Sequence, residues 1–296
     1  MNLKRIALIR ISTFILCILA STFSFSLELC AQKNTHKEFS NLSFDKQFIV
    51  IAHRGASAYF PENTMAAFKA AVEMNADMIE LDVLLSKDNI PIVFHDEKLN
   101  AKTNGKGFVK DFSLSELQEL DAGSWFDKKF KGERIPTLRE VLEYCKDKIL
   151  VNVEIKTEAV SELEQGGIEE LVLNMIEELR IQDQVIISSF DYRVLERIGN
   201  NNQNVRTALL YEKKQSKRRE PIALVKKYNV DAFNFSIKQL SDKWATQLNN
   251  SGIPFFIYTV NDEKKMKQVI EAGAKGIFSD KPDVLKRVVE EFYKQK

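Results

Sequence analysis

The chain has 296 residues, and its 44% share of hydrophobic residues is enough for the core of one large domain or two average ones. Its 43 lysines and arginines nearly balance its 42 aspartates and glutamates, which leaves a net charge of +1. This balance provides no general attraction to nucleic acid or to an anionic membrane surface, so any anion must be recognised by a local site.

The first 31 residues have the layout of a secretory signal peptide. Three cations within the first ten residues precede an uncharged apolar run over residues 11–27, and Leu29-Cys30-Ala31 provides a Leu-x-Ala cleavage site. The run is marginal in length for a membrane span. We therefore expect export, to a periplasm or by secretion. The alternatives are an uncleaved N-terminal anchor and a lipid on Cys30, although Glu28 fits a lipoprotein signal poorly.

The mature chain is expected to begin at Gln32. Cleavage removes three cations and Glu28, which leaves 40 cations against 41 anions, a net charge of −1, with Cys145 as the remaining cysteine. A single cysteine excludes an intrachain disulfide, so stability must come from the core. Residues 32–46 are polar and predict a linker, and residues 47–296 predict one domain. We expect no nucleic-acid partner and no stable membrane insertion of the mature chain.

From residue 48 onward, strand-like apolar runs alternate with amphipathic helical stretches. The predicted strands are residues 48–52, 77–86, 150–156, 185–190, 206–211, 232–236, 254–260 and 276–279. The predicted helices are residues 65–72, 137–146, 162–180, 191–199, 220–228, 241–250, 263–272 and 282–294. Eight strands separated by helices predict an α/β fold of the TIM-type (β/α)8 barrel, and an open doubly wound sheet is the structural alternative.

One connection after the second strand departs from this repeat. With that strand taken through Lys87, only Asp88 and Asn89 separate it from the apolar run that starts at Ile90. This connection is too short for a parallel crossover but suits a tight hairpin. A two-residue loop places His95 opposite Asp82, and side-chain alternation puts Glu80 on the same face. Residues 99–136 then form a short insertion, which either shapes substrate access or is an inert packed excursion.

Chemically reactive residues lie at the ends of the predicted strands. In chain order they are His53, Arg54, Glu80, Asp82, His95, Glu154 and Lys156. Any one of them is compatible with an ordinary polar residue facing water. Together, two histidines, three carboxylates, an arginine and a lysine are the residue set for metal-assisted acid/base chemistry on an anion.

The chemistry of each residue type indicates a role. Glu80, Asp82 and Glu154 offer hard oxygen ligands, which favour Mg²⁺ or Ca²⁺ over zinc. Arg54 and Lys156 suit the remaining charge of a bound phosphate. One histidine can remove a proton from the nucleophile while the other protonates the leaving alcohol, and the sequence leaves the two roles interchangeable.

Seven short motifs extend across the predicted barrel. They are His53-Arg54-Gly55, Pro61-Glu62-Asn63-Thr64, Glu80-Leu81-Asp82-Val83, His95-Asp96, Glu154-Ile155-Lys156, Tyr258-Thr259-Val260-Asn261 and Ser279-Asp280-Lys281-Pro282-Asp283. In this order they resemble the motifs of the glycerophosphodiester phosphodiesterase family. The match covers nearly the whole chain from Val50 to Asp283, which makes the resemblance specific.

The resemblance implies a TIM barrel that hydrolyses glycerophosphodiesters, which are deacylated phospholipids, to glycerol 3-phosphate and an alcohol. It implies His53 and His95 as the acid/base pair. It also implies one divalent cation, Ca²⁺ or Mg²⁺, on Glu80, Asp82 and Glu154. The resemblance also implies attack of the neighbouring glycerol hydroxyl on phosphorus, with a cyclic phosphate as the intermediate.

Two positions depart from the family pattern. Tyr258 stands where a tryptophan is common, and we expect its ring to form a wall of the substrate pocket. Residues 100–105 replace the usual Asp-Arg-Thr-Thr-Asn-Gly, which leaves anion contacts from that loop without support. Four aromatic residues are candidates for the pocket mouth, with the core as their alternative: Phe60, Trp125, Phe190 and Phe256.

Two other functions remain open at this stage. A related enzyme could act on an intact lysophospholipid, and it would need an exposed apolar rim. A binding module could capture phosphodiesters for uptake without turnover. A binder needs charge but has no use for two titratable proton carriers, so the two histidines favour an enzyme.

Overall fold

The computed structural model describes residues 44–163, 166–201 and 204–295. The predicted signal peptide lies outside these residues, as does the predicted linker up to residue 43, so both stay predictions. Within the described residues, no helix has the length and apolar character needed to cross a membrane.

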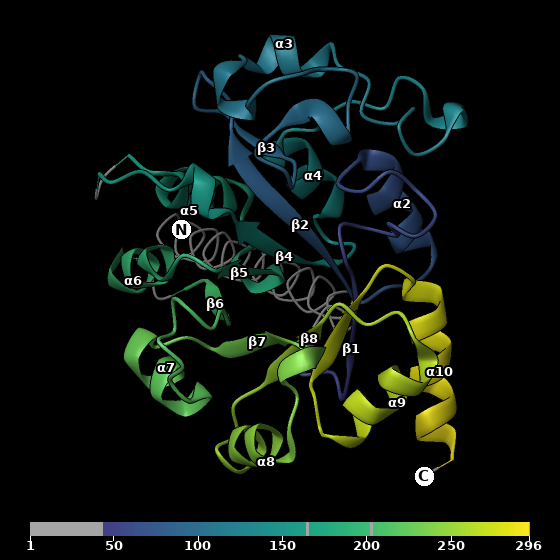
Figure 1. Ribbon diagram of the computed structural model, residues 1–296, viewed down its shortest axis with the longest axis vertical. Helices are drawn as coiled ribbons and strands as arrows, with labels where there is room; N and C mark the ends of the chain where they lie inside the picture. Colours follow the sequence, from purple (N-terminus) through teal and green to yellow (C-terminus); the bar gives the residue numbers. More distant parts are fainter. Residues whose placement is uncertain (1–43, 164–165, 202–203, 296) are drawn as a thin grey trace, which may run out of the picture. The chain divides into compact units, whose positions relative to one another are not determined.

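Eight parallel strands form a closed barrel (Figure 1). They are β1 (Ile49–Ala52), β2 (Met78–Leu85), β4 (Leu150–Ile155), β5 (Val185–Ser189), β6 (Arg206–Leu210), β7 (Ala232–Ser236), β8 (Phe255–Tyr258) and β9 (Gly276–Ser279). The first strand pairs with both β2 and β9, which closes the sheet. This closure confirms the predicted (β/α)8 barrel and rules out the open doubly wound sheet.

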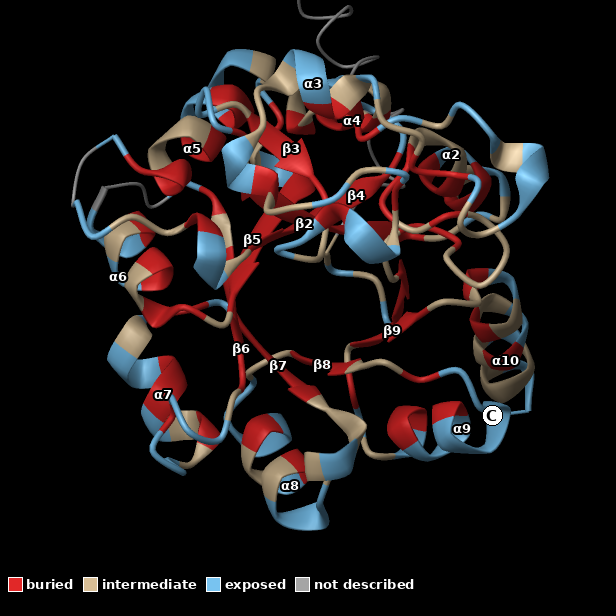
Figure 2. Cartoon of the chain, turned by 45° about the horizontal axis from the view of Figure 1, so that its top comes forward, coloured by how far each residue is buried: buried red, intermediate tan, exposed pale blue. Residues whose placement is uncertain are grey.

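Helices surround the barrel, as the view in Figure 2 shows. They are α2 (Met65–Glu73), α4 (Leu138–Cys145), α5 (Ile168–Leu179), α6 (Tyr192–Asn201), α7 (Pro221–Tyr228), α8 (Asp242–Asn250), α9 (Glu263–Glu271) and α10 (Pro282–Lys294). Side chains alternate along each strand, so one set packs outward against the helices and the other set points into the barrel interior. On β7, for example, Phe233 and Phe235 pack against Trp244 of α8, which turns Asn234 between them toward the interior.

The hairpin after β2 forms as predicted, but its register differs by one residue. The antiparallel strand β3 (Pro91–Val93) pairs Leu84 with Ile92, so the loop has three residues. Asn89 adopts a left-handed φ of 59°, and the Ser86 hydroxyl accepts a hydrogen bond from the Ile90 N–H at 2.9 Å. This Ser86 contact stabilises a longer loop than the two-residue turn assumed from sequence.

The corrected register changes the residue that faces Asp82. The Phe94 N–H donates to the Asp82 carbonyl at 3.0 Å, so Phe94, and not His95, lies opposite Asp82. The predicted pairing of His95 with Asp82 was therefore wrong. His95 still approaches the carboxylates, because β3 ends at Val93 and the alternation of a regular strand no longer fixes its direction.

The insertion over residues 99–136 is a packed excursion with its own short helices. These are η2 (Leu99–Ala101), η3 (Val109–Asp111), α3 (Leu114–Gln118) and η4 (Lys128–Phe130). Leu99, Val109 and Leu117 are buried and join the hydrophobic core on the β2 side of the barrel. The insertion is thereby held against the carboxyl end of β2, next to the predicted site.

Candidate active site

Strand register brings three carboxylates together at the carboxyl end of the barrel. Asp82 on β2 is the pairing partner of Glu154 on β4, and Glu80 precedes Asp82 by two positions on the same face. Oxygen atoms of all three residues lie within 4.8 Å of one another, and all three residues are buried. The predicted ligand set is therefore a single cluster.

The cluster carries more negative charge than its surroundings balance. Burial and the charge of Asp82 raise the pKa of Glu80 to about 8 and also raise the pKa of Glu154. Asp82 behaves differently: burial opposes its ionisation, but Arg54 and Lys156 lower its pKa to about 2. A divalent cation on three hard oxygen donors would relieve this repulsion, so the donor set fits Ca²⁺ or Mg²⁺.

A strained turn after β1 directs Arg54 into the site. Arg54 has a left-handed φ of 54°, and its backbone N–H donates to Glu80 Oε2 at 2.8 Å. Gly55 follows with φ 80°, and a Cβ there would lie 2.6 Å from the backbone carbon of Ala67. The turn therefore requires glycine, because a side chain would clash with α2.

The guanidinium of Arg54 lies between two carboxylates. Its Nη1 donates to Glu62 Oε1 at 2.9 Å, and its Nε lies 3.2 Å from Asp82 Oδ2 without hydrogen-bond geometry. Asn63 positions the Asp82 carboxylate, since its Nδ2 donates to the same Asp82 oxygen at 2.9 Å. The motif containing Glu62 and Asn63 thus orients both Arg54 and a predicted metal ligand.

Lys156 supplies the second cation of the site. Its Nζ lies 2.9 Å from Glu154 Oε1 and 3.4 Å from Asp82 Oδ1. Burial disfavours the charged ammonium, but the two carboxylates outweigh it and raise the pKa of Lys156. Lys156 therefore stays charged, which suits a group that binds phosphate; this role stays a prediction for both Lys156 and Arg54.

His53 is held by a network that the sequence had not assigned. Its Nδ1 lies 2.6 Å from Asp280 Oδ1, Ser57 Oγ donates to the same oxygen at 3.0 Å, and Asn261 Nδ2 donates to Asp280 Oδ2 at 2.6 Å. Burial lowers the pKa of His53, but Asp280 and Glu80 together raise it. With Nδ1 engaged, Nε2 remains for proton transfer.

Barrel closure was the signal that could have identified Asp280. Ala52 pairs with Ser279, so the residues that follow them, His53 and Asp280, must emerge side by side. The His53 N–H also donates to the Ser279 carbonyl at 3.0 Å. Partial burial beside this histidine makes Asp280 harder to ionise, but the hydrogen bond from His53 lowers its pKa to about 2.

The second histidine has a simpler environment. His95 Nδ1 lies 2.7 Å from Asp96 Oδ1, the carboxylate of its neighbour in sequence. Both histidines line one cavity of about 240 Å³ together with Arg54, Glu80, Glu154 and Lys156. The structure thus brings the predicted proton carriers, phosphate-binding groups and carboxylates into a single site.

Part of the lining of this cavity is aromatic. Tyr258 and Phe190 line it, with ring centroids 6.0 Å apart in an edge-on contact. Tyr258 donates its hydroxyl to the Tyr211 carbonyl at 3.1 Å, and burial with the nearby Glu154 raises its pKa. Tyr258 therefore lines this cavity with a neutral hydroxyl, and its part in a substrate pocket stays a prediction.

The other three aromatic candidates lie elsewhere. Phe60 packs against Phe130, with ring centroids 5.3 Å apart. Phe256 lines a different pocket, formed with Phe44. Trp125 donates its indole N–H to the Ala122 carbonyl within the insertion. Of the four, only Phe190 lines the cavity.

A contact from the insertion reaches Arg54 indirectly. Lys102 Nζ lies 3.1 Å from Glu62 Oε2, and Glu62 Oε1 accepts from Arg54. The same ammonium lies 3.8 Å from the ring centroid of Trp125, a cation–π contact. Lys102 belongs to residues 100–105, the loop that departs from the family pattern. Its charge acts on the site through Glu62.

The chain resembles known phosphodiesterases over most of its length. A profile of the glycerophosphoryl diester phosphodiesterase family matches residues 53–284. The chain is 42% identical over 242 residues to a glycerophosphodiester phosphodiesterase of Caldanaerobacter subterraneus subsp. tengcongensis, an alignment that covers 81% of this chain and 97% of the relative.

Solved structures of similar fold agree with this match. A phosphodiesterase of Oleispira antarctica, in complex with the product sn-glycerol-3-phosphate, has a TM-score of 0.74 and 28% identity, covering 81% of this chain and 96% of that one. A glycerophosphodiester phosphodiesterase of Agrobacterium tumefaciens has a TM-score of 0.71 and 26% identity, covering 81% of this chain and 99% of the other.

Proposed function

Because the chain belongs to the glycerophosphoryl diester phosphodiesterase family, we propose that it hydrolyses glycerophosphodiesters to glycerol 3-phosphate and an alcohol by metal-dependent, two-histidine catalysis. The observation that carries this proposal is the single cavity that unites His53, His95, Arg54, Lys156 and the carboxylate cluster. The cavity therefore contains the groups needed to bind a phosphodiester and to transfer two protons.

Each residue has a part that follows from its contacts. Glu80, Asp82 and Glu154 would hold the cation, which when bound polarises a phosphate oxygen as a Lewis acid. Arg54 and Lys156 bind the other phosphate oxygens, since both are charged and lie beside the cluster.

The histidines move the protons. One takes a proton from the attacking oxygen as the new bond to phosphorus forms, and the other gives a proton to the alcohol oxygen as its bond to phosphorus breaks. Where the neighbouring glycerol hydroxyl attacks, the product is a cyclic phosphate, and water must then add to phosphorus to open it to glycerol 3-phosphate. Asp280 favours the charged form of His53, and Asp96 orients His95. Tyr258 and Phe190 exclude water from the apolar side of the pocket.

Turnover with and without a metal chelator tests the proposal directly. Residues 32–296 would be incubated with glycerophosphocholine and glycerophosphoethanolamine in Ca²⁺ or Mg²⁺, with and without EDTA, and glycerol 3-phosphate would be assayed. We expect release with a cation, loss in EDTA and recovery when the cation is restored. A folded protein that binds these diesters and returns them intact would instead be a binding module.

A water-soluble substrate fits the surface better than an intact lysolipid. Among the described residues, Leu163 is the large hydrophobic side chain that stands exposed, at 72%. An enzyme that works at a lipid surface needs a wider apolar rim around its pocket. Activity that appears only with lysolipid micelles would contradict this assignment.

We further propose that the enzyme acts outside the cytoplasm, in a periplasm or the medium. The support is the sequence of residues 1–31, with its cations, apolar run and Leu-x-Ala site. Mass spectrometry of the protein expressed with its full N-terminus tests this. An exported chain that begins at Gln32 is expected, and retention of residues 1–31 or a lipid on Cys30 would indicate anchoring instead.

A further inference from the structure

The active-site cavity is also lined by an asparagine that the proposed chemistry does not use. Asn152 lies on β4 two positions before Glu154 and on the same face of the strand, and it lines the cavity although only 2% of its surface is exposed. Its Nδ2 donates to Ser188 Oγ at 2.9 Å. Among the described residues, its Oδ1 has no hydrogen-bond partner. A buried amide oxygen that borders a cavity without a partner predicts a hydrogen-bond donor on the ligand.

The neighbours of Asn152 place it at the inner end of the cavity. It is the register partner of Glu80, so it lies beside a predicted cation ligand, and Glu154 follows it toward the carboxyl end of β4. Leu210 and Phe278 line the cavity as well, and both are buried. Because the interior of such a barrel is a packed core, the cavity ends at these side chains. Asn152 therefore belongs to an enclosed floor, opposite the open mouth.

The depth of this floor matches the glycerol part of the proposed substrate. Positions two residues apart on a strand are separated by about 7 Å, which is the distance from Glu154 down to Asn152 along β4. In extended glycerol 3-phosphate, the terminal hydroxyl oxygen lies about 6 Å from phosphorus. A phosphate held at the carboxylate cluster can therefore place that hydroxyl within hydrogen-bond distance of Asn152.

The geometry of the reaction favours this direction of binding. In phosphoryl transfer, the attacking and leaving oxygens lie roughly in line on opposite sides of phosphorus. The leaving alcohol differs in size among glycerophosphodiesters, so it suits the open mouth of the cavity. The glycerol unit is the same in all of them and carries the neighbouring hydroxyl that attacks. It therefore points toward the floor, where buried side chains leave room for a group of fixed size.

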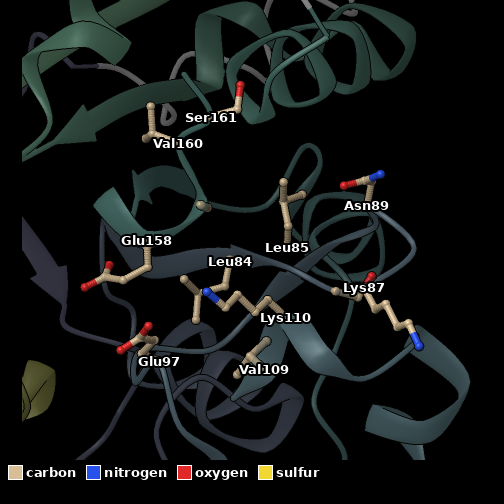
Figure 3. A pocket seen from close by; sticks show the side chains of 12 residues that line it. Leu84, Leu85, Lys87, Asn89, Glu97, Val109, Lys110, Glu158, Val160 and Ser161 are labelled. Atoms are coloured by element: carbon tan, nitrogen blue, oxygen red, sulfur yellow. The ribbon is translucent and has the colours of Figure 1, made fainter. Parts of the chain in front are cut away.

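Two other features of the described residues lack this combination. The pocket in Figure 3, of about 280 Å³, lies farther along β2, and its lining residues, which include Leu84, Glu97 and Lys110, do not line the active-site cavity. Asn234 on β7 has both amide atoms buried without a partner, but it does not line that cavity. Of these three places, only the floor at Asn152 joins an unpartnered polar atom to the site of reaction.

We propose that Asn152 binds the terminal hydroxyl of the glycerol unit and selects diesters that carry this hydroxyl over diesters that lack it. This inference rests on the proposed phosphodiesterase activity and adds a residue that determines specificity for glycerol. Ser188 is a positioning residue, because its hydroxyl accepts from Nδ2 and leaves Oδ1 for the ligand. A diester without the terminal hydroxyl leaves Oδ1 buried and unpaired, which lowers its kcat/KM.

The test compares two diesters that differ only in this hydroxyl. Glycerophosphoethanolamine carries it, and the 2-hydroxypropyl diester of ethanolamine lacks it but keeps the attacking hydroxyl. The ratio of their kcat/KM values would be measured with Ca²⁺ for the wild type and for Asn152→Leu. We expect a ratio of about 10 to 100 in the wild type. In Asn152→Leu it should fall to within about threefold of 1, because leucine neither offers nor needs a hydrogen bond.

Three further variants separate this contact from a general disturbance of the barrel. Asn234→Leu makes the same substitution at another buried interior asparagine and should keep the wild-type ratio. Ser188→Ala keeps the amide but removes its anchor, so it should lower the ratio by only about two- to fivefold. Asn152→Ala repeats the measurement with a smaller side chain if Asn152→Leu does not fold.

Cation binding distinguishes this role from that of a metal ligand. Calorimetric titration of the wild type and Asn152→Leu with Ca²⁺, without substrate, should give affinities within about twofold of each other, because the proposed partner of Oδ1 is a hydroxyl. A clear loss of Ca²⁺ affinity, with equal losses of kcat/KM for both diesters, would overturn the inference and make Asn152 a cation ligand.

The remaining outcomes separate this inference from the proposed function. If the wild type hydrolyses both diesters equally well, Asn152 does not select for the hydroxyl, although the phosphodiesterase assignment stands. The same conclusion follows if Asn234→Leu lowers the ratio as much as Asn152→Leu does. If the wild type hydrolyses neither diester in the presence of a cation, the proposed function fails and the inference fails with it.

Discussion

The two histidines of the site are held in contrasting ways. His53 follows a barrel strand, and its partner Asp280 lies 227 residues away and accepts further hydrogen bonds from Ser57 and Asn261. His95 follows the short strand β3, and its partner is the adjacent Asp96. The first histidine is positioned by the barrel itself and the second by its own neighbour.

The difference teaches where preorganisation comes from in this fold. Residues at the closure of the barrel gain partners from both ends of the chain, so their positions depend on the whole fold. A histidine on a connection depends mainly on local structure and can adjust when substrate binds. His53 should therefore tolerate loss of its partner less well than His95.

The largest effect should come from removing either ring. We expect His53→Ala and His95→Ala each to lower kcat by about 10²- to 10⁴-fold, because each removes one proton transfer. A diester with a 4-nitrophenol leaving group, which leaves without protonation, should restore activity in only one of the two variants. The histidine that is missing from the rescued variant is the general acid. Rescue of both variants would contradict the division of roles.

The partners of the histidines should differ in importance. Asp280→Asn should lower kcat by about 10- to 100-fold, the usual cost of losing a group that orients a reactive residue, and Asp96→Asn by less than about tenfold. NMR titration of the His53 ring in the Asp280→Asn protein should move to lower pH, because Asp280 raises the pKa of His53. Equal losses of kcat in Asp280→Asn and Asp96→Asn would mean that the two histidines depend on their partners to the same degree.

This contrast also separates what sequence could predict from what it could not. The barrel followed from strand and helix periodicity, and the site residues followed from their places at strand ends. The role of Asp280 required the register between β1 and β9, which no local pattern encodes. The hairpin register failed because the Ser86 hydroxyl and the left-handed Asn89 support a three-residue loop.

A smaller effect is expected for Arg54, which resembles its neighbour His53 in depending on distant residues. In Lys102→Met, Glu62 loses one of its two cationic partners and attracts Arg54 more strongly. We expect KM to rise about two- to fivefold with kcat little changed, because phosphate binding weakens in all states alike. Lys129→Met, which removes a similar cation–π contact from Phe130, is the matched control. A fall in kcat at constant KM would instead place Lys102 in the chemical step.

The smallest effect concerns stability, and pH determines its size. The pKa of His53 is raised, so its pairing stabilises the fold fully below about pH 6.5, the unfolded value, and this contribution is lost as pH rises through the folded value. The pKa of Asp280 is lowered to about 2, so its contribution is full above about pH 4 and is lost as pH falls toward 2.

The cost of Asp280→Asn should therefore be greatest between about pH 4 and 6.5 and smaller at pH 9. Thermal unfolding in metal-free buffer at pH 5.5 and pH 9 measures this difference, with Asp96→Asn as the comparison. We expect a Tm decrease for Asp280→Asn of a few degrees at pH 5.5, since about 1 kcal/mol shifts Tm by roughly 2–4 °C in a domain of this size. A Tm decrease of the same size at both pH values would mean that Asp280 supports the fold through Ser57 and Asn261, independently of the charge on His53.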